Sequence, residues 1–233
     1  MSTPAVFAID RVEFSHGPWT WPFAEQRRDA IDASFAQRRA ITPQLWNGRV
    51  LLVNDFRLDG ATLRGSFFET DFASFIAWRD WGCPDHTIRN VFAMGAIRST
   101  DGAYILGVMG EHTVNPGRVY FPAGTPDPDD IAGDKVDLAG SVLREVAEET
   151  GLTEADFVAD PDWTAVMIGP RIALMRVLQA HEDAAALRTK ALDHISRQKE
   201  SELADIHVVR SRRDFDPNMP DFMTAFLTAV LAD

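Results

Sequence analysis

The sequence contains a single cysteine, Cys83, among its 233 residues. One cysteine excludes an intramolecular disulfide, and a chain without disulfides is typical of a reducing compartment. A lone cysteine of this kind is typically a small buried apolar side chain. The six histidines are scattered without the spacing of zinc ligands, which argues against a zinc site.

Basic residues are also scarce. The chain has 23 Lys and Arg against 35 Asp and Glu, which gives a formal net charge of -12. Proteins that bind nucleic acid present basic surface, so we expect no nucleic-acid partner. A site for a polyanion in such an acidic chain requires metal cations to offset the repulsion.

The sequence has no long hydrophobic run, no internal repeat and no low-complexity tract. We therefore expect no signal peptide, no membrane span and a cytoplasmic location. The apolar fraction of 45% and the charged fraction of 25% are those of a globular protein with a sizeable core. The length allows one large domain or a domain with an extension.

Helix and strand patterns alternate along the first third of the chain. Apolar residues at helical spacing predict a helix over 22–39. Strands are predicted over 48–58 and 61–68, joined by an Asp-Gly turn. Asp71 has the position of an N-cap for the next helix.

A second set of elements follows a break near residues 82–90. Mixed strands with helices at both ends favour an α/β or α+β sandwich, whose two units can share one core. The strands are expected over 91–97, 104–108, 117–121, 163–169, 171–178 and 206–210, and the helices over about 137–150, 181–198 and 220–231.

Three glutamates crowd one short helical segment, residues 144–152, with the sequence REVAEETGL. Glu145, Glu148 and Glu149 have i, i+3, i+4 spacing, which places them together at the edge of the buried stripe. Gly151 is expected to end the helix in a left-handed cap. Crowded carboxylates near a core repel one another unless a hard cation such as Mg²⁺ is present. The alternative is an acidic face with no ligand.

Residues 144–152 resemble the second half of the Nudix box, Gly-x5-Glu-x7-Arg-Glu-U-x-Glu-Glu-x-Gly-U with U apolar, and Phe121–Gly124 resembles its opening turn. The resemblance implies an α/β (α+β) fold, a Nudix-type α/β/α sandwich with a mixed sheet. It implies an N-terminal α/β extension over 1–88 and a Nudix domain over 89–233. The family hydrolyses a diphosphate linked to another moiety and uses Mg²⁺ or Mn²⁺.

The first half of the box departs from the pattern. Gly124 and Arg144 are separated by 20 positions where the family has 14, so six residues are inserted. Counted back from Arg144, the first glutamate of the box falls at Val136, and Asp134 and Asp137 are the nearest carboxylates. We expect Gly124 and Asp137 to contact the substrate.

The order of elements over residues 25–155 is similar to the Nudix branch that hydrolyses UDP-glucose. The expected substrate is therefore a small nucleoside diphosphate-linked compound, with a UDP-sugar as first candidate. The lengthened loop is also similar to that of coenzyme A pyrophosphatases, the second candidate. A non-catalytic Nudix-like nucleotide-binding protein is a further alternative. The family also implies a homodimer.

The resemblance implies roles for particular residues. Glu145, Glu148 and Glu149 hold the metal, and Arg144 orients these carboxylates. The proton acceptor is expected in the loop after residue 198. Glu202 is the first choice there and Glu200 the second, although two solvated surface carboxylates would give the same pattern.

Two further groups of residues stay open. The phosphate-binding arginines are sought among Arg89, Arg98, Arg118 and Arg171. Tryptophans gather in the first unit and serve either as core packing or as a platform for a nucleobase, with packing favoured. They are Trp19, Trp21, Trp46, Trp78 and Trp81.

Overall fold

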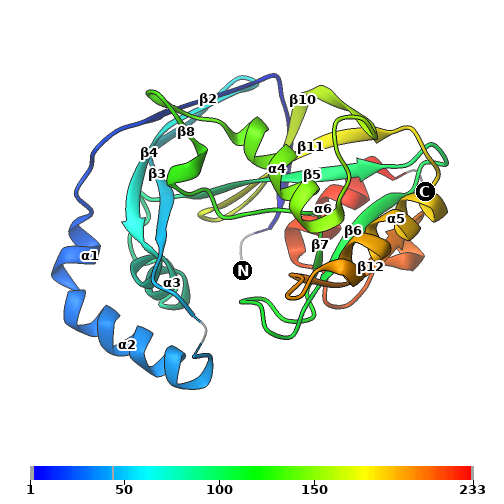
Figure 1. Cartoon of the computed structure of the whole chain (residues 1–233). Helices are drawn as coiled ribbons and strands as arrows, with labels where there is room; N and C mark the ends of the chain where they lie inside the picture. The colour runs from blue at the N-terminus through cyan, green and yellow to red at the C-terminus, as the bar shows by residue number, and fades with distance from the viewer. Residues whose placement is uncertain (1–2, 44, 232–233) are drawn as a thin grey trace.

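Two β-sheets form the framework of the computed structural model, which describes residues 3–43 and 45–231 (Figure 1). The larger sheet has the order β1-β10-β11-β5-β6-β12, and β7 pairs with β6. Strands β11 and β5 are parallel, and the other neighbours are antiparallel, so the sheet is mixed as predicted. Its strands are β1 (Ala5–Ile9), β5 (Asn90–Arg98), β6 (Tyr104–Met109), β7 (Val119–Tyr120), β10 (Phe157–Ile168), β11 (Arg171–Ala180) and β12 (Leu203–Val209).

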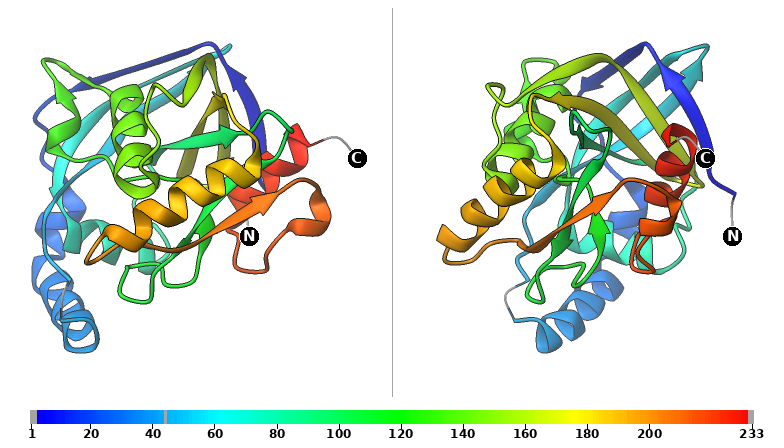
Figure 2. Two further views of the ribbon diagram at one scale, coloured as in Figure 1. Left: turned by 45° about the vertical axis from the view of Figure 1, so that its right-hand side comes forward. Right: turned by 90° about the vertical axis from the view of Figure 1, so that its right-hand side faces the viewer.

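Helices cover both faces of this sheet. Helices α4 (Leu138–Thr150) and α5 (Ala184–Arg197) share a core with Ala93 of β5, whereas α6 (Asp221–Val230) shares a separate core with Met94. Neighbouring residues of a strand point to opposite faces, so these two cores lie on opposite sides of the sheet. The right view of Figure 2 shows α5 and α6 on the two sides. The predicted mixed α+β sandwich is confirmed.

The second sheet belongs mainly to the first unit. It has the order β3-β4-β2-β9-β8, and its strands are β2 (Arg11–His16), β3 (Arg49–Asp59), β4 (Thr62–Asp71), β8 (Ile131–Ala132) and β9 (Lys135–Val136). Gly60 has a φ of 59° at the β3–β4 turn, which is the left-handed conformation that the Asp-Gly turn requires. Helices α1 (Pro22–Gln26), α2 (Arg28–Ile41) and α3 (Phe72–Asp80) lie beside it (Figure 1). Asp71 caps α3 as predicted, because its carboxylate accepts a hydrogen bond from the Ser74 N–H at 3.0 Å.

Several elements differ from the sequence prediction. The single helix expected over 22–39 is two helices that meet at Arg27. Strand β10 begins at Phe157 rather than Trp163. Its pairing with β11 is interrupted where Pro161 stands, so the sequence pattern indicated only the part of the strand after this interruption. Strands β1, β2, β8 and β9 were absent from the prediction. Strand β1 is largely exposed and the last two have two residues each, so none of these three carries a clear hydrophobic alternation.

The two units exchange strands and share a core. Strand β1 comes from the first unit and pairs with β10 of the second, while β9 comes from the second and pairs with β2 of the first. One buried cluster includes Ile9, Phe14 and Phe67 together with Val91 and Val146. The predicted boundary between two domains near residue 88 stays a prediction. The buried cluster that both units share allows a direct test of it.

A chain that begins at residue 86 is expected not to fold, because it lacks β1 and the Phe67 side of the shared core. The milder change Phe67→Ala removes a side chain that is 0% exposed and should destabilise the whole protein by about 3–5 kcal/mol in a single unfolding transition. Phe7→Ala is the matched control, since Phe7 is 37% exposed. Denaturant melts followed by circular dichroism measure both. A cooperative transition of the shortened chain would contradict the shared core.

In the part of the chain that the structure describes, no helix combines the length and the apolar character needed to cross a membrane.

Candidate functional site

Helix α4 is held in place at both ends and along one face. Asp137 is its N-cap and accepts a hydrogen bond from the Gly140 N–H at 2.9 Å, and Gly151 ends it with a φ of 71°. A Cβ atom at Gly95 would lie 2.4 Å from Val146, so glycine at that position lets α4 approach β5 closely. Both predicted helix ends are confirmed. This fixed helix sets the positions of the three glutamates.

The three glutamates differ in exposure. Glu149 is only 5% exposed, Glu145 is half-buried, and Glu148 is exposed. One carboxylate oxygen of Glu149, Oε1, accepts a hydrogen bond from the Ala123 N–H at 3.3 Å. The other, Oε2, is buried and has no hydrogen-bond partner within the described residues. A buried carboxylate oxygen without a partner is costly, so this position calls for a cation or a donor from a ligand.

The carboxyl groups of this cluster influence one another. Burial raises the pKa of Glu149 well above its ordinary value, and the charges of Glu145, Glu202 and Glu148 raise it further against the opposing Ala123 hydrogen bond. Burial also raises the pKa of Glu145 to about 7, with Arg144 opposing the shift and Glu148 and Glu202 adding to it. The cluster is therefore poorly tolerant of full ionisation unless positive charge is supplied.

Glu202 belongs to this cluster although it is far away in the sequence. It lies in the loop between α5 and β12, and its carbonyl oxygen accepts a hydrogen bond from the Gly110 N–H at 2.7 Å, which holds the loop. Its charge acts on the pKa values of both Glu145 and Glu149. Glu200 is exposed in the same loop and lines the first cavity. The structure thus brings the first-choice proton acceptor to the helix carboxylates, while its role stays a prediction.

Gly124 lies directly against the Glu145 carboxylate. A Cβ atom at Gly124 would be 2.4 Å from Glu145 Oε1 and 2.7 Å from Cδ. Any side chain at this position would displace the carboxylate, so glycine is needed for the contact with Glu145. Its predicted contact with a substrate stays untested.

Arg144 is held by an aspartate that the sequence interpretation missed. Its Nη2 donates to Asp130 Oδ1 at 2.8 Å and more weakly to Glu145 Oε1 at 3.5 Å. Asp130 is 4% exposed, and its other oxygen accepts a hydrogen bond from the Asp127 N–H at 3.1 Å. Arg144 therefore links a rigid buried aspartate to one of the helix glutamates.

The structure shows the surroundings of Val136, the position where the family spacing counted back from Arg144 places the first glutamate of the box. Val136 is a buried apolar residue of β9, and the inserted residues form the β8–β9 hairpin that joins the second sheet. Asp130 stands six positions after Gly124, which is the Gly-x5-Glu spacing counted from the glycine end. Counted forward from Gly124, the family spacing therefore points to Asp130, the aspartate that binds Arg144.

Asp137 is the N-cap of α4, and its predicted contact with the substrate stays a prediction. Its carboxylate is used as the cap of α4, and it lines neither of the two cavities beside the cluster. The exposed Asp134 lies in the β8–β9 hairpin and lines neither cavity. A capping aspartate and a site aspartate look alike in sequence, so the pattern of this loop did not single out Asp130.

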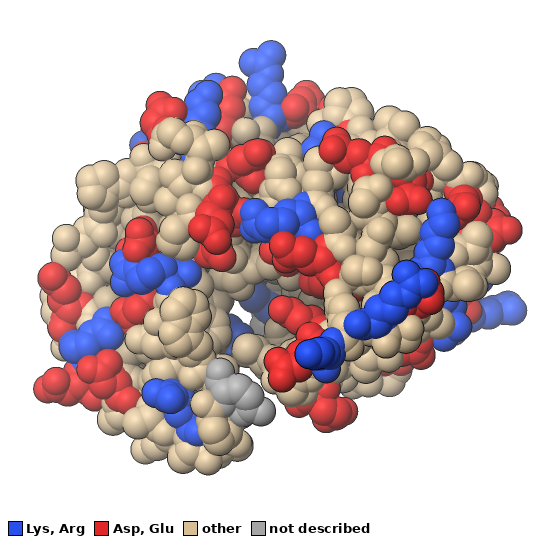
Figure 3. All heavy atoms as spheres, in the orientation of Figure 1, with Lys and Arg blue, Asp and Glu red and all other residues tan. Residues whose placement is uncertain are grey.

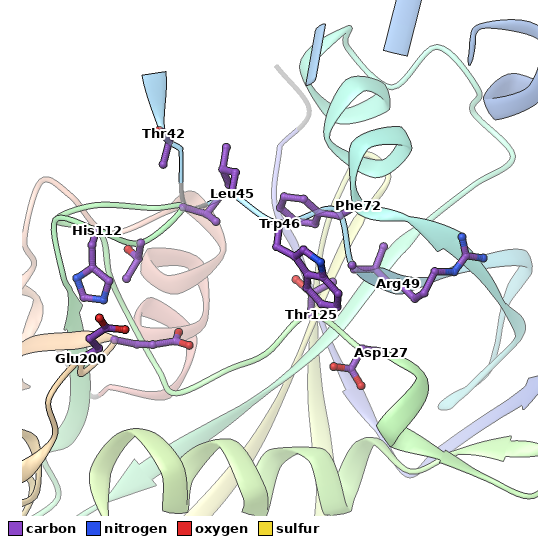
Figure 4. A pocket seen from close by; sticks show the side chains of 14 residues that line it. Thr42, Leu45, Trp46, Arg49, Phe72, His112, Thr125, Asp127 and Glu200 are labelled. Carbon is purple, nitrogen blue, oxygen red and sulfur yellow. The ribbon is translucent and has the colours of Figure 1, made fainter. Parts of the chain in front are cut away.

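Two cavities flank the turn formed by Gly124 and Thr125. The first, of about 460 Å³, lies between the two units and is lined by Trp46, His112, Asp127, Glu200 and Glu202 among others. Figure 4 shows Trp46 and Asp127 on one wall, with His112 and Glu200 on the other. Trp46 is 81% exposed, whereas Trp21 and Trp78 are buried in the core. Trp46 alone of these three is free to contact a ligand.

The second cavity, of about 580 Å³, extends from Gly124 past Arg118 to Arg171. Figure 3 shows a hollow between the two units, with acidic side chains on its rim and basic atoms inside it. Of the four candidate arginines, Arg118 and Arg171 line this cavity. Arg89 instead donates to the carbonyl oxygen of Ile88, and Arg98 lies exposed at the end of β5. The structure therefore narrows the candidates for anion binding to two.

Within the described residues, no group of three carboxylate, imidazole or thiol side chains is arranged so as to enclose a metal ion. The chemistry of the cluster nevertheless fits a hard cation. Its donors are oxygens, and one of them is buried without a partner. The pKa values of Glu145 and Glu149 are raised by burial and further by the neighbouring carboxylates.

Comparisons with known proteins give a limited result. No protein-family model matches the chain, and no curated protein matches it. Similar solved structures include the MutT protein from Methanosarcina mazei (19% identity, 60% of this chain and 91% of that chain, TM-score 0.39). Others are the Nudix hydrolase RenU from M. smegmatis (13%, 61% and 86%, 0.39) and the Bacillus subtilis pyrophosphohydrolase BsRppH (12%, 60% and 75%, 0.35). At these TM-scores the likeness carries no argument about activity, so the functional case rests on the geometry of the site.

Removing the charge of Asp130 is expected to impair the site without unfolding the protein. Asp130→Asn keeps the shape of the side chain but weakens its hold on Arg144, and hence on Glu145. Changes to such supporting groups commonly cost about 10- to 100-fold in activity or metal affinity. Titration with Mn²⁺ and initial-rate assays measure the two effects. Asp129→Asn, at the exposed neighbour, is the control, and equal behaviour of both variants would remove Asp130 from the site.

Proposed function

We propose that the protein is a metal-dependent hydrolase of the Nudix type that cleaves a nucleoside diphosphate-linked compound at its diphosphate by water attack. The observation that carries this proposal is the buried Glu149 carboxylate. One of its oxygens has no partner within the described residues, and its pKa is raised by burial and by three further glutamates, Glu145, Glu202 and Glu148. A buried carboxylate oxygen without a partner destabilises the fold, so we do not expect it in a helix whose role is purely structural.

The residues of α4 would hold Mg²⁺ or Mn²⁺. Glu149 and Glu145 provide the buried and half-buried carboxylates, and the exposed Glu148 completes the set. When bound, the ion neutralises the diphosphate and lowers the pKa of a coordinated water. Arg144, held by Asp130, fixes the orientation of Glu145, while Gly124 keeps the backbone close to that carboxylate.

Glu202 is the proposed general base. It is exposed at the cavity and within electrostatic range of the helix carboxylates, so it can take a proton from the attacking water. The water oxygen forms a new bond to one phosphorus, and the anhydride bond from that phosphorus to the bridging oxygen breaks. The departing phosphate carries away the bonding electrons as an anion.

The first cavity supports a nucleotide-linked sugar as the first candidate substrate. The exposed Trp46 ring offers a flat apolar face for a base or a sugar. Asp127 and Glu200 line the same cavity and can accept hydrogen bonds from hydroxyl groups. A UDP-sugar meets both requirements, and coenzyme A or another diphosphate compound is the second candidate. The homodimer expected from the family stays a prediction.

The test is incubation with Mg²⁺ and a panel of nucleoside diphosphate compounds, followed by ³¹P NMR. New phosphate monoester resonances that disappear on adding a chelator are expected for at least one compound. Absence of any new resonance would overturn the hydrolase proposal. Ligand binding without turnover would then identify a nucleotide-binding protein. The absence of a tight-site Mn²⁺ signal in electron paramagnetic resonance would instead identify an acidic helix face without a ligand.

A further inference from the structure

The second cavity has a chemistry that the proposed hydrolysis does not require. Three arginines line it, Arg79, Arg118 and Arg171, and among the described lining residues Asp221 is the single acidic side chain. This excess of positive charge occurs in a chain whose formal net charge is -12. The cavity is therefore a local exception to the acidic surface, and it is suited to an anion.

Two of these arginines are available to a ligand. In the described parts of the chain, neither Arg118 nor Arg171 forms an ion pair with a carboxylate, whereas Arg79 contacts Asp80 at 3.2 Å. A guanidinium without a carboxylate partner binds phosphate or carboxylate groups through paired hydrogen bonds. Arg171 comes from the start of β11 and Arg118 from the segment before β7, so the two approach the cavity from different strands.

The arginine at the far end is too distant to serve the diphosphate at the glutamates. Arg171 lies beside Asn90 at the start of β5. Gly95, further along β5, donates a hydrogen bond to the Pro122 carbonyl oxygen at 3.1 Å and lies against Val146 of α4. Val146 directly follows Glu145 in the helix, so the position of Gly95 along β5 serves as the reference point for the glutamates. Five residues of strand correspond to about 16 Å. Two linked phosphoryl groups span only a few ångströms, so the remainder of the substrate has to fill this interval.

The walls between the two ends suit a ring system. Phe92 and Phe222 form an edge-to-face pair with centroids 5.4 Å apart, and Phe72 lines the cavity as well. The Asn90 Oδ1 atom is buried and has no hydrogen-bond partner within the described residues, so it can accept a hydrogen bond from a ligand N–H or O–H. A volume of about 580 Å³ lies within the usual range for small-molecule sites.

We propose that this arginine-lined cavity binds the part of the substrate beyond the diphosphate and selects compounds that carry a second anionic group at that end. The group is a phosphate monoester or a carboxylate, and Arg171 is its specificity-determining contact. The inference rests on the proposed function, because it takes the diphosphate to lie at Glu145 and Glu149.

The experiment compares pairs of compounds that differ only in the second anionic group. NADPH against NADH tests a phosphate monoester, and UDP-glucuronate against UDP-glucose tests a carboxylate. For at least one pair, the unaltered protein should show a kcat/KM roughly 10- to 100-fold higher for the anionic member, as expected for hydrogen bonds to a charged group. Arg171→Gln should bring kcat/KM for the two members of that pair near parity.

The control is Arg98→Gln, at an exposed arginine on β5 that lines neither cavity, and it should keep the full preference. The inference would be overturned if Arg171→Gln kept the same ratio of kcat/KM between the two members of each pair as the unaltered protein. If no compound is hydrolysed, the proposed function fails, and calorimetric binding of the same pairs decides the inference separately. Tighter binding of the anionic member that Arg171→Gln loses would support it, and equal affinities would overturn it.

Discussion

Replacing Glu149 by glutamine is expected to abolish metal-dependent hydrolysis and to stabilise the metal-free protein. The amide keeps the shape of the side chain but is a poor ligand for a hard cation. Loss of a metal contribution of several kcal/mol lowers the rate by about 10³-fold or more. Initial rates at saturating Mg²⁺ measure this effect, and undiminished turnover would show that Glu149 is not a ligand.

The stability effect of Glu149→Gln has a defined dependence on pH. The pKa of Glu149 is raised in the folded protein, so the buried carboxyl costs nothing below its ordinary pKa and destabilises the fold as pH rises. In a chelator at pH 8 the variant should therefore melt at a higher temperature than the unaltered protein, and at pH 4 the difference should vanish. Glu154→Gln, at an exposed glutamate beyond the helix, is the control. A lower melting temperature at pH 8 would contradict the account of crowded charge.

Replacing Glu202 by glutamine is expected to lower kcat by about 10²- to 10⁴-fold, the usual contribution of a general base. The affinity for Mg²⁺ should change much less than in Glu149→Gln, because Glu202 is exposed and outside the proposed ligand set. Steady-state kinetics with metal titration separate the two effects. Glu200→Gln tests the second choice in the same loop. If Glu202→Gln keeps kcat within a factor of two, Glu145 is the best remaining base.

Much of the candidate site could be predicted from sequence because its central element is local. The spacing of Glu145, Glu148 and Glu149 depends only on helical geometry, and the caps at Asp137 and Gly151 depend on residues within one turn. The same holds for Asp71 at the start of α3 and for the turn at Gly60. Patterns of this kind hold wherever the element sits in the fold, so the sequence alone determined α4, its ends and its crowded carboxylates.

Contacts between distant parts of the chain were decided by the tertiary structure. Asp130 meets Arg144 because the inserted residues fold into the β8–β9 hairpin and pair with β2, which no local pattern indicates. The loop sequence likewise could not show that Glu202 reaches the glutamates of α4, only that such a loop follows α5.

The same limit applies to side chains of one type. Trp78 is buried while Trp46 is exposed at a cavity, and Arg171 lines a cavity while Arg98 lines none. Residue type and periodicity fix which face of an element a side chain occupies. What that face meets depends on which strands pair and which helices pack against them, and those choices are settled by burial summed over the whole chain.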